Sequence, residues 1–295
     1  MINKLKQKIN KYFRKLFSES MKENLLKYTQ NQQIIQKVIQ QNNKLLKKHD
    51  KETFRDSGFG VYSQTDEDGL LYIFSIIGHG SRKAVEIGAG NGIKNNTANL
   101  VINHGWDALM IDGNDKSLEK GRQFYSKNSK TRIWPPKMVS AHVTAENINN
   151  IISENNYEGK IDLLSLDIDG MDYWILKAIN VIEPRVIVVE YQDILGPERS
   201  WCVPYDSNFL AKHEPNGDVN YGGASLKAFN KLLTKRDYRL VGTNIYGFNA
   251  FFIKNSEGDK ALPEIEIENC FSHPKVKAGM RYRFPKIKNM KWEEV

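Results

Sequence analysis

The sequence predicts a doubly wound α/β fold with a mostly parallel sheet of seven strands, preceded by a helical arm. Three observations predict this fold class. Short β-rich runs alternate with helical stretches from about residue 60 onward, and such crossovers make successive strands parallel. A glycine-rich turn follows the first of these runs, as at a ligand site of an open α/β sheet. The last two runs are close enough in sequence to form an antiparallel hairpin.

Residues 1–50 are predicted to be a basic helical arm. They contain no Gly or Pro, and their apolar residues recur at helical spacing. Twelve Lys/Arg and three acidic residues give the arm a charge of +9, so the rest of the chain carries −1 of the total +8. Three interpretations stay open: packing on its own domain, self-association into a homo-oligomer through a short coiled coil, or contact with an anionic membrane surface.

The length and composition exclude several classes of protein. With 295 residues and 40% hydrophobic content, the chain is long enough to bury a substantial core. No apolar run approaches the roughly 20 residues of a membrane span, and the N-terminus has no signal-peptide pattern. Cys202 and Cys270 lie 68 positions apart, which leaves no disulfide framework or zinc ribbon. A cytoplasmic location is expected, with peripheral attachment at the inner membrane surface left open.

The elements after the arm follow from hydrophobic spacing. A catalytic domain is predicted over 51–255 and a C-terminal extension packed on it over 256–295. Pro184 is expected just before the fifth strand, and the irregular segment 192–221 is expected to be functional. Four- to six-residue β-rich runs predict strands at 83–87, 108–111, 137–140, 161–166, 186–190, 239–242 and 249–253. Amphipathic spacing predicts helices at 70–77, 95–103, 116–125, 146–153, 171–179 and 225–235.

The strongest chemical signal is the glycine-rich turn after the first predicted strand. Gly88, Gly90 and Gly92 alternate there, so the backbone can turn sharply and approach a ligand, and the next helix start offers N–H donors. Asp112 ends the following strand, where a carboxylate would meet a ribose diol. Together these features indicate a nucleotide-type ligand. The NAD fingerprint would need a third glycine where the chain has Ile93.

The alternating glycines after the acidic Glu86 resemble motif I of class I S-adenosylmethionine-dependent methyltransferases, and Asp112 stands where their ribose-binding acid does. Over roughly 60–253 the chain is similar to FkbM-like, sugar-modifying members. The resemblance implies a Rossmann-like methyltransferase fold and S-adenosylmethionine as cofactor. The donor contacts that it implies are Gln64, Glu86, Gly88, Gly90, Asn91, Asp112, Gly113, Val143, Thr144 and Asp167. For Asp66 and Asp68, capping of the helix 70–77 is the simpler interpretation.

Acidic residues gather at the ends of the fourth and fifth predicted strands. Asp167, Asp169 and Glu190 are candidate catalytic residues there, and their hard oxygen ligands also suit Mg²⁺. The alternative is that Asp169 or Asp172 caps the following helix. Proton removal from a hydroxyl needs a base, and His213 in the long irregular segment is a further candidate for that role.

The resemblance implies a methyltransferase (EC 2.1.1) that O-methylates a sugar or glycan-linked hydroxyl of a cell-surface polysaccharide, such as a capsule, or its precursor. Nucleic acid is disfavoured as substrate because the chain has neither an Asn-Pro-Pro-aromatic motif nor a Pro-Cys dipeptide, although the basic arm leaves RNA open. Two other classes remain as alternatives: an NAD-dependent oxidoreductase on a Rossmann fold, and a non-catalytic coiled-coil assembly protein.

Overall fold

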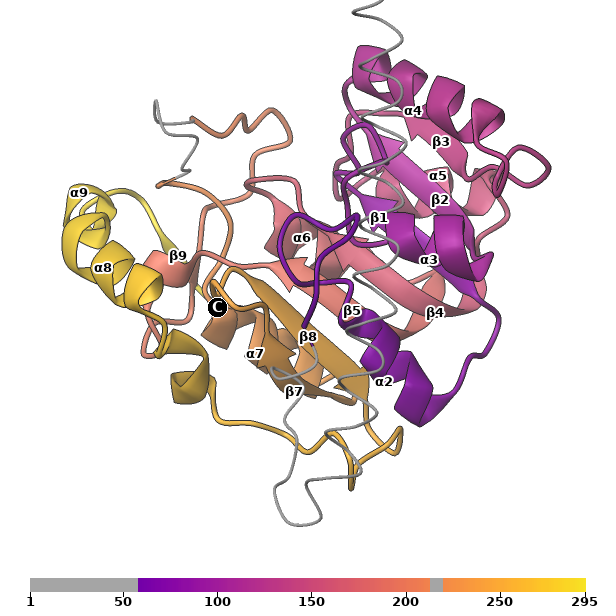
Figure 1. The fold of residues 1–295 in the computed structure, drawn as a ribbon. Helices are drawn as coiled ribbons and strands as arrows, with labels where there is room; N and C mark the ends of the chain where they lie inside the picture. Colours follow the sequence, from indigo (N-terminus) through magenta and orange to yellow (C-terminus); the bar gives the residue numbers. More distant parts are fainter. Residues whose placement is uncertain (1–57, 213–219) are drawn as a thin grey trace, which may run out of the picture. The chain divides into compact units, whose positions relative to one another are not determined.

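The computed structural model describes residues 58–212 and 220–295. The predicted arm, residues 1–50, lies outside the described residues. A seven-stranded sheet with the order β3-β2-β1-β4-β5-β8-β7 forms the centre (Figure 1). The strands are β1 Lys83–Ile87, β2 Asp107–Asp112, β3 Lys137–Ser140, β4 Gly159–Leu166, β5 Ile182–Glu190, β7 Tyr238–Thr243 and β8 Asn249–Lys254. The first five are parallel and β8 is antiparallel to both of its neighbours, so the predicted fold class is confirmed.

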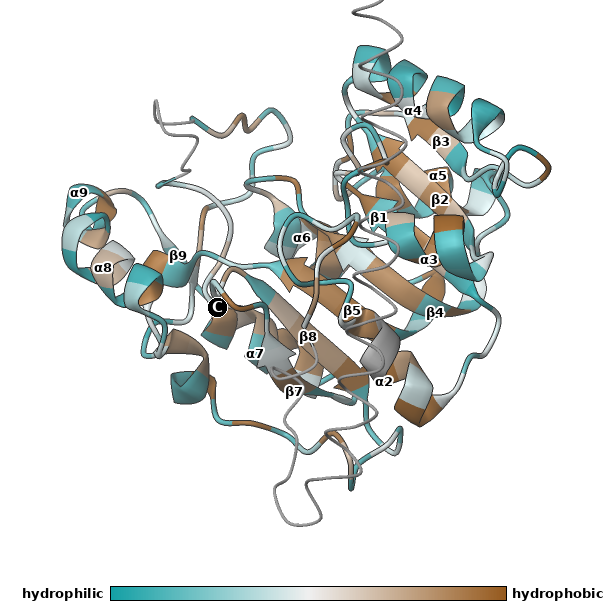
Figure 2. Cartoon of the chain, viewed as in Figure 1, coloured by the Kyte–Doolittle hydropathy of each residue, from teal (hydrophilic) through white to brown (hydrophobic). Residues whose placement is uncertain are grey.

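Helices cover both faces of this sheet. On one face, α2 Leu70–Ile77, α3 Ala98–His104 and α4 Asp115–Lys127 pack on strand residues such as Ala84 and Val186. On the other, α5 Ile148–Glu154, α6 Asp172–Ala178 and α7 Leu226–Thr234 pack on residues such as Val85 and Ile187. Side chains that alternate along each strand therefore feed two separate cores, and the hydrophobic strands stand out in Figure 2. No helix of the described segments is long and apolar enough to span a membrane.

Ser225, at the predicted start of the helix 225–235, caps α7: its side chain accepts a hydrogen bond from the N–H of Ala228 at 3.2 Å. Pro184 lies inside β5 and not before it. There β5 pairs only with β4, and its pairing with β8 starts at Val186, so the missing N–H of Pro184 breaks no ladder.

The capping interpretation of Asp66 and Asp68 is wrong, because α2 begins after Gly69 without a side-chain cap. The carboxylate of Asp68 instead accepts hydrogen bonds from the N–H groups of Val61 and Tyr62 at 2.6 and 2.8 Å. Asp66 accepts one from the N–H of Ile245 at 3.0 Å. Asp68 therefore folds the segment before α2 on itself, and Asp66 ties that segment to a distant turn, which helical spacing cannot reveal.

The segment after β8 lies beside the ends of the parallel strands. It contains η3 Ile267–Phe271, α8 Pro274–Tyr282, α9 Phe284–Ile287 and β9 Glu293–Glu294. Strand β9 pairs with β6, Trp201–Cys202, and the Trp292 ring stacks on that of Trp201 at 6.1 Å. A Cβ built on Gly279 would lie 2.9 Å from Ile194 in η2, Asp193–Leu195, so α8 packs closely on the turn that follows β5.

Candidate active site

A cavity of about 750 Å³ lies at the carboxyl ends of the parallel strands. Its wall is formed where β1, β2, β3, β4 and β5 end, with further residues from the segment 205–211 and from the C-terminal helices. This is the edge at which open α/β sheets bind ligands, because the strand order reverses there and leaves a crevice.

The glycine turn shapes the floor of this cavity. Gly88 has a φ of +84°, and a Cβ at this position would lie 1.6 Å from the carbonyl oxygen of Asp167. No other residue fits so close to the backbone of the neighbouring strand end. Gly90, with φ +58°, has nothing within 4 Å of its Cβ position and lines the cavity. The two glycines thus let bare backbone face the ligand space.

Asp112 is held in place by the backbone of two loops. Its carboxylate accepts hydrogen bonds from the N–H of Gly90 and the N–H of Asn114, each at 2.7 Å. A carboxylate has about four lone-pair sites, so capacity remains for hydroxyl donors. Asp112 lines the cavity, and so do seven other predicted donor contacts: Gln64, Gly88, Gly90, Gly113, Val143, Thr144 and Asp167.

Two predicted donor contacts are not part of the cavity lining. Glu86 is buried under the turn, where its carboxylate accepts hydrogen bonds from the N–H groups of Asn96 at 3.0 Å and Thr97 at 2.9 Å. Burial raises the pKa of Glu86 to about 7. Asn91 accepts a hydrogen bond from the N–H of Ile93 at 3.0 Å and so stabilises the turn itself. Both side chains hold the glycine turn in shape from the side that faces away from the cavity.

The predicted acidic cluster is brought together at the ends of β4 and β5. Carboxylate oxygens of Asp167, Asp169 and Glu190 all lie within 4.8 Å of one another, and all three residues line the cavity. Burial raises the pKa of Asp167 to about 7, and the negative charges of Asp172 and Asp169 contribute. Burial and the charge of Asp167 raise the pKa of Glu190 well above its usual range. Asp167 and Glu190 therefore compete for negative charge, as two close carboxylates must.

Asp172 does not cap α6, which begins after Met171 without a side-chain cap. Its two carboxylate oxygens accept hydrogen bonds from the N–H of Ile168 at 2.8 Å and the N–H of Gly170 at 2.9 Å. These bonds fix the loop that carries Asp169, whose φ of +59° is unusual for a residue with a side chain. Asp172 thus orients the cluster.

The cluster has the chemistry of a site for a hard divalent cation. Three carboxylates offer oxygen ligands of the kind that Mg²⁺ and Ca²⁺ prefer. A cation bound there would also relieve the repulsion that raises the pKa values of these acids. The donor set of Asp167, Asp169 and Glu190 therefore fits the predicted metal.

The far side of the cavity was only partly predicted. Tyr205 from the irregular segment lines it, whereas the nearby aromatic residues Trp201 and Tyr221 do not: Trp201 packs on Trp292, and the Tyr221 hydroxyl donates to the carbonyl of Lys291. His213, the candidate base, lies outside the described residues. Lining residues that sequence reasoning missed include Phe209, Phe248, Lys275 and Arg283. For the last two, the signal in the sequence is the excess of Lys and Arg over acidic residues in 274–295.

Comparison with known protein families decides the class of enzyme. Residues 81–240, more than half of the chain, match the methyltransferase FkbM domain. The chain belongs to the FkbM methyltransferase family. It is therefore an S-adenosylmethionine-dependent methyltransferase (EC 2.1.1), as predicted, and neither an oxidoreductase nor a non-catalytic assembly protein. No curated protein matches this methyltransferase in sequence.

Solved structures resemble the methyltransferase at low identity. Magnesium protoporphyrin IX methyltransferase of Synechocystis PCC 6803, with bound SAM, is 9% identical with a TM-score of 0.37, covering 63% of this chain and 79% of that one. The N-terminal domain of EvdMO1, with SAH and D-fucose, is 14% identical with a TM-score of 0.43, covering 74% and 94%. An O-methyltransferase from Bacillus cereus, with SAH, is 14% identical with a TM-score of 0.41, covering 74% and 88%.

Proposed function

We propose that this methyltransferase transfers the methyl group of S-adenosylmethionine to a hydroxyl of a sugar or a glycan-linked precursor, as in the synthesis of a capsule or another cell-surface polysaccharide. The observation that supports this proposal is the position of the acidic cluster. Its carboxylates lie in the same cavity as the glycine turn. The carbonyl oxygen of Asp167 lies so close to Gly88 that a Cβ there would be only 1.6 Å from it. A proton acceptor thus stands beside the donor site.

The residues divide the work of the reaction. Bound S-adenosylmethionine supplies a methyl group that is already activated on sulfur. Gly88 and Gly90 would admit the donor to the strand ends, and Asp112 would accept hydrogen bonds from its ribose hydroxyls. Transfer of the methyl group to the acceptor oxygen would leave the electron pair of the broken S–C bond on sulfur and release the hydroxyl proton, which Glu190 or Asp167 is placed to take. Without a cation in the cluster, the raised pKa values of these two acids place them closer to the pKa that suits a general base near neutral pH.

The acceptor class is tested by incubating the full chain with S-adenosylmethionine and a panel of sugars and nucleotide sugars. Mass spectrometry should then reveal a mass gain of one methylene group on a hydroxyl-bearing acceptor. Methylation of amines or nucleobases, with no product on any sugar, would contradict the proposal.

The donor site is tested by the variant Gly88→Ala, with Gly105→Ala as matched control. Both positions have positive φ, +84° and +66°, but a Cβ at Gly105 meets nothing within 4 Å. Both variants should lose about 1 kcal/mol to backbone strain, and Gly88→Ala should lose more because its Cβ overlaps the carbonyl of Asp167. Only Gly88→Ala should also lose binding of S-adenosylhomocysteine in calorimetry, because its new methyl group displaces the turn from Asp167. If both variants bound S-adenosylhomocysteine equally well, the glycine turn would not be part of the donor site.

A cation in the acidic cluster is a second part of the proposal. Asp167, Asp169 and Glu190 would hold Mg²⁺, and the ion would compensate their negative charge. Millimolar Mg²⁺ should raise the thermal unfolding temperature of the wild type, and EDTA should reverse this shift. The variant Asp169→Asn should show a smaller shift or none. A shift of the same size in the variant would place the cation elsewhere.

For residues 1–50 we propose, from the sequence alone, a role in homo-oligomerisation or attachment to the cytoplasmic membrane surface. A chain without these residues should retain methyl transfer. It should differ from the full chain in mass by light scattering, or in sedimentation with anionic vesicles. If the truncated chain differs in neither property, the arm packs on its own domain.

A further inference from the structure

The strand order places different groups of lining residues at the two ends of the cavity. Most predicted donor contacts follow β1, β2 and β3, the acidic cluster lies at the ends of β4 and β5, and Phe248 lies directly before β8. Neighbouring strands are spaced by about 4.8 Å, so the start of β8 lies three strand spacings, roughly 14 Å, from the glycine turn on β1. The part of the cavity beside β5 and β8 is therefore left for the acceptor, and we call it the acceptor half.

Two basic side chains line this acceptor half. Lys275 belongs to α8 and Arg283 follows its last residue, and they are the only Lys and Arg among the described lining residues. The ammonium group of Lys275 lies 4.9 Å from the centre of the Phe248 ring. The carbonyl of Phe248 accepts a hydrogen bond from the N–H of Tyr191 at 2.8 Å, next to Glu190. The ammonium group is thus placed at the same strand ends as the acidic cluster.

The two cations differ in how they are held. Arg283 donates a hydrogen bond from Nε to the side-chain oxygen of Asn220 at 2.8 Å, and its Nη1 lies 3.9 Å from a carboxylate oxygen of Asp193. Lys275 is exposed, and within the described part of the chain no carboxylate oxygen lies within ion-pair distance of its ammonium group. Its charge is available to a ligand, while Arg283 is already oriented.

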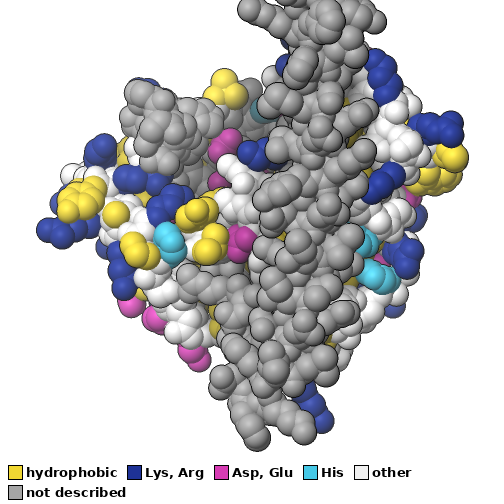
Figure 3. Space-filling model, in the orientation of Figure 1, with side chains coloured by type: hydrophobic (Ala, Val, Ile, Leu, Met, Phe, Trp, Pro, Cys, Tyr) yellow, Lys and Arg dark blue, Asp and Glu magenta, His cyan; other side chains and the backbone are white. Residues whose placement is uncertain are grey.

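The C-terminal segment that carries these two residues is also positively charged. Residues 274–295 contain seven Lys or Arg and two Glu, and Figure 3 shows the basic side chains gathered over α8 and α9. A field of one sign at a cavity entrance attracts ligands of the opposite sign and speeds their association. A neutral sugar would gain nothing from this charge.

The carboxylate of the methyl donor is the other anion that enters this cavity. Most predicted donor contacts follow β1, β2 and β3, and the acidic cluster at β4 and β5 lies between these strand ends and Lys275. Gln64 is the exception, because its neighbour Thr65 accepts a hydrogen bond from the side chain of Asn244, whose oxygen in turn accepts one from the N–H of Phe248. We assign the group bound to Lys275 to the acceptor, and binding of S-adenosylhomocysteine by Lys275→Gln tests this assignment.

We propose that the acceptor is an anionic sugar: a phosphate or carboxylate group binds Lys275 and Arg283, while the reacting hydroxyl faces Asp167 and Glu190. This inference rests on the proposed sugar-hydroxyl function and names its substrate class. The opposite charges at the two ends of the acceptor half orient the sugar. The hydroxyl faces the acidic end because Lys275 and Arg283 hold the anion at the other.

The first test measures anion binding without turnover. Calorimetry on the full chain, saturated with S-adenosylhomocysteine, should detect binding of pyrophosphate or glucuronate, the two probes that separate a phosphate from a carboxylate. Lys275→Gln should weaken that binding by about tenfold, the effect of one charge-assisted hydrogen bond. Lys277→Gln is the matched control, since Lys277 is exposed on the same helix and does not line the cavity. Its binding should match the wild type.

Several results would overturn the inference: no binding of either anion, equal weakening by both variants, or weaker binding of S-adenosylhomocysteine by Lys275→Gln. Arg283→Lys keeps the charge and should retain most of the anion binding, which separates charge from the packing of α8.

The second test compares methylation of glucose 1-phosphate, glucuronic acid and glucose. The wild type should prefer one of the anionic sugars, and Lys275→Gln should lower that preference through KM. Methylation of glucose as efficient as that of both anionic sugars would refute the inference and leave the sugar-hydroxyl function intact. Methylation of no sugar, with anion binding unchanged, would count against the function and not against the anion site.

Discussion

The two ends of strands β4 and β5 carry opposite electrostatic designs. Near their starts, Asp162 of β4 lies beside Arg185 of β5, with a distance of 3.0 Å between a carboxylate oxygen and Nη1. Five residues further along each strand, Asp167 follows β4 and Glu190 ends β5. The same pair of strands thus places opposite charges together at one end and like charges together at the other.

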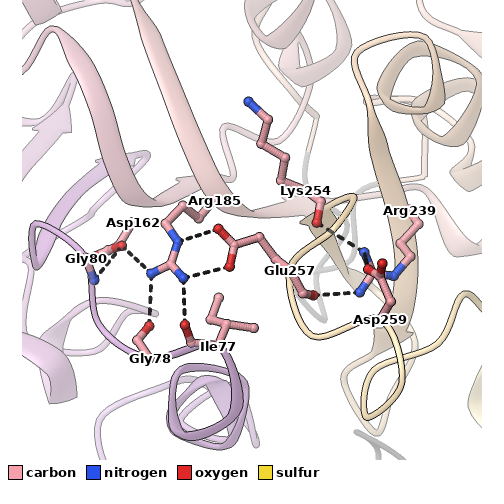
Figure 4. A network of polar contacts seen from close by, with 9 residues as sticks. All are labelled: Ile77, Gly78, Gly80, Asp162, Arg185, Arg239, Lys254, Glu257 and Asp259. Atoms are coloured by element: carbon pink, nitrogen blue, oxygen red, sulfur yellow. Dashed lines mark hydrogen bonds and ion pairs between the residues drawn. The ribbon is translucent and has the colours of Figure 1, made fainter.

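The balanced end is a closed network (Figure 4). Arg185 forms two hydrogen bonds with the carboxylate of Glu257, at 3.0 and 2.8 Å. It also donates to the carbonyls of Ile77 and Gly78, at the end of α2. Arg185 lowers the pKa of Glu257, whereas the carboxyl groups at the other end have raised pKa values.

The difference separates a structural from a functional polar cluster. A polar cluster that only holds elements together can pair every charge within the fold. Arg185 does this by joining β4, β5, the end of α2 and the segment after β8. A site that must take up a proton or a cation keeps like charges together and gives up stability for it. The comparison leads to three predictions, in order of their expected effect on the free energy of unfolding.

The largest effect is expected for Arg185→Met. The change leaves the fully buried carboxylate of Asp162 without its cation, and breaking a buried pair in this way costs about 3–5 kcal/mol. Urea unfolding measures the loss. Lys254→Met is the control, because its partner Glu183 is 47% exposed, and such pairs contribute about 1 kcal/mol or less. If both variants lose the same amount, the network at this end is not a structural one.

A smaller effect, dependent on pH, is expected for Glu86→Gln, an acid on β1 between the two ends. The pKa of Glu86 is raised from 4.5 to about 7 in the folded state. Between these values the folded chain holds a proton that the unfolded chain has lost, so this group's contribution to stability falls as pH rises through the window. The variant lacks this loss and should gain on the wild type by on the order of 3 kcal/mol across the window.

Urea unfolding at several pH values checks this expectation. Asp115→Asn, at an acid that is 67% exposed, should show no such trend relative to the wild type. A constant gap between Glu86→Gln and the wild type would mean that the hydrogen bonds from Asn96 and Thr97 keep the carboxylate ionised throughout.

The smallest effect on stability, a gain as for Glu86→Gln, is expected for Asp167→Asn. Removing one charge from the acidic cluster should stabilise the ligand-free fold by about 1 kcal/mol and abolish most methyl transfer. Asp162→Asn, on the same strand, should instead destabilise it, because Arg185 loses its partner. Thermal unfolding of the two variants, side by side, decides the matter. Destabilisation by both would mean that the two strand ends do not differ in design.

Local patterns in the sequence predicted the part of the molecule that local physics builds. The bounds of β1 and β3 and the glycine turn follow from hydrophobic runs and backbone freedom, and the structure has them where the sequence placed them. The acids at the strand ends converge because parallel strands end at one edge. Glu86 was predicted to contact the donor, but it faces the N–H groups of Asn96 and Thr97. The sequence of a strand does not show whether a given side chain near its end faces a cavity or the start of a helix.

The acceptor half shows why the rest was not predicted. Lys275 and Arg283 reach the cavity because the segment after β8 docks on distant elements, through Gly279 beside Ile194 and through Trp292 on Trp201, 91 residues earlier in the sequence. No periodic pattern in the tail encodes such a contact. The same holds for the hydrogen bond of Asp66 to Ile245, which joins segments 179 positions apart.

The cavity described above is continuous from the glycine turn to Phe248. One linear molecule, an adenosine group tethered to a charged sugar mimic, can therefore occupy both halves at once. Tethering makes the second contact intramolecular and can raise avidity by about 10²–10⁴ over either fragment. A bisubstrate inhibitor built on this span would draw its affinity from both halves of the cavity.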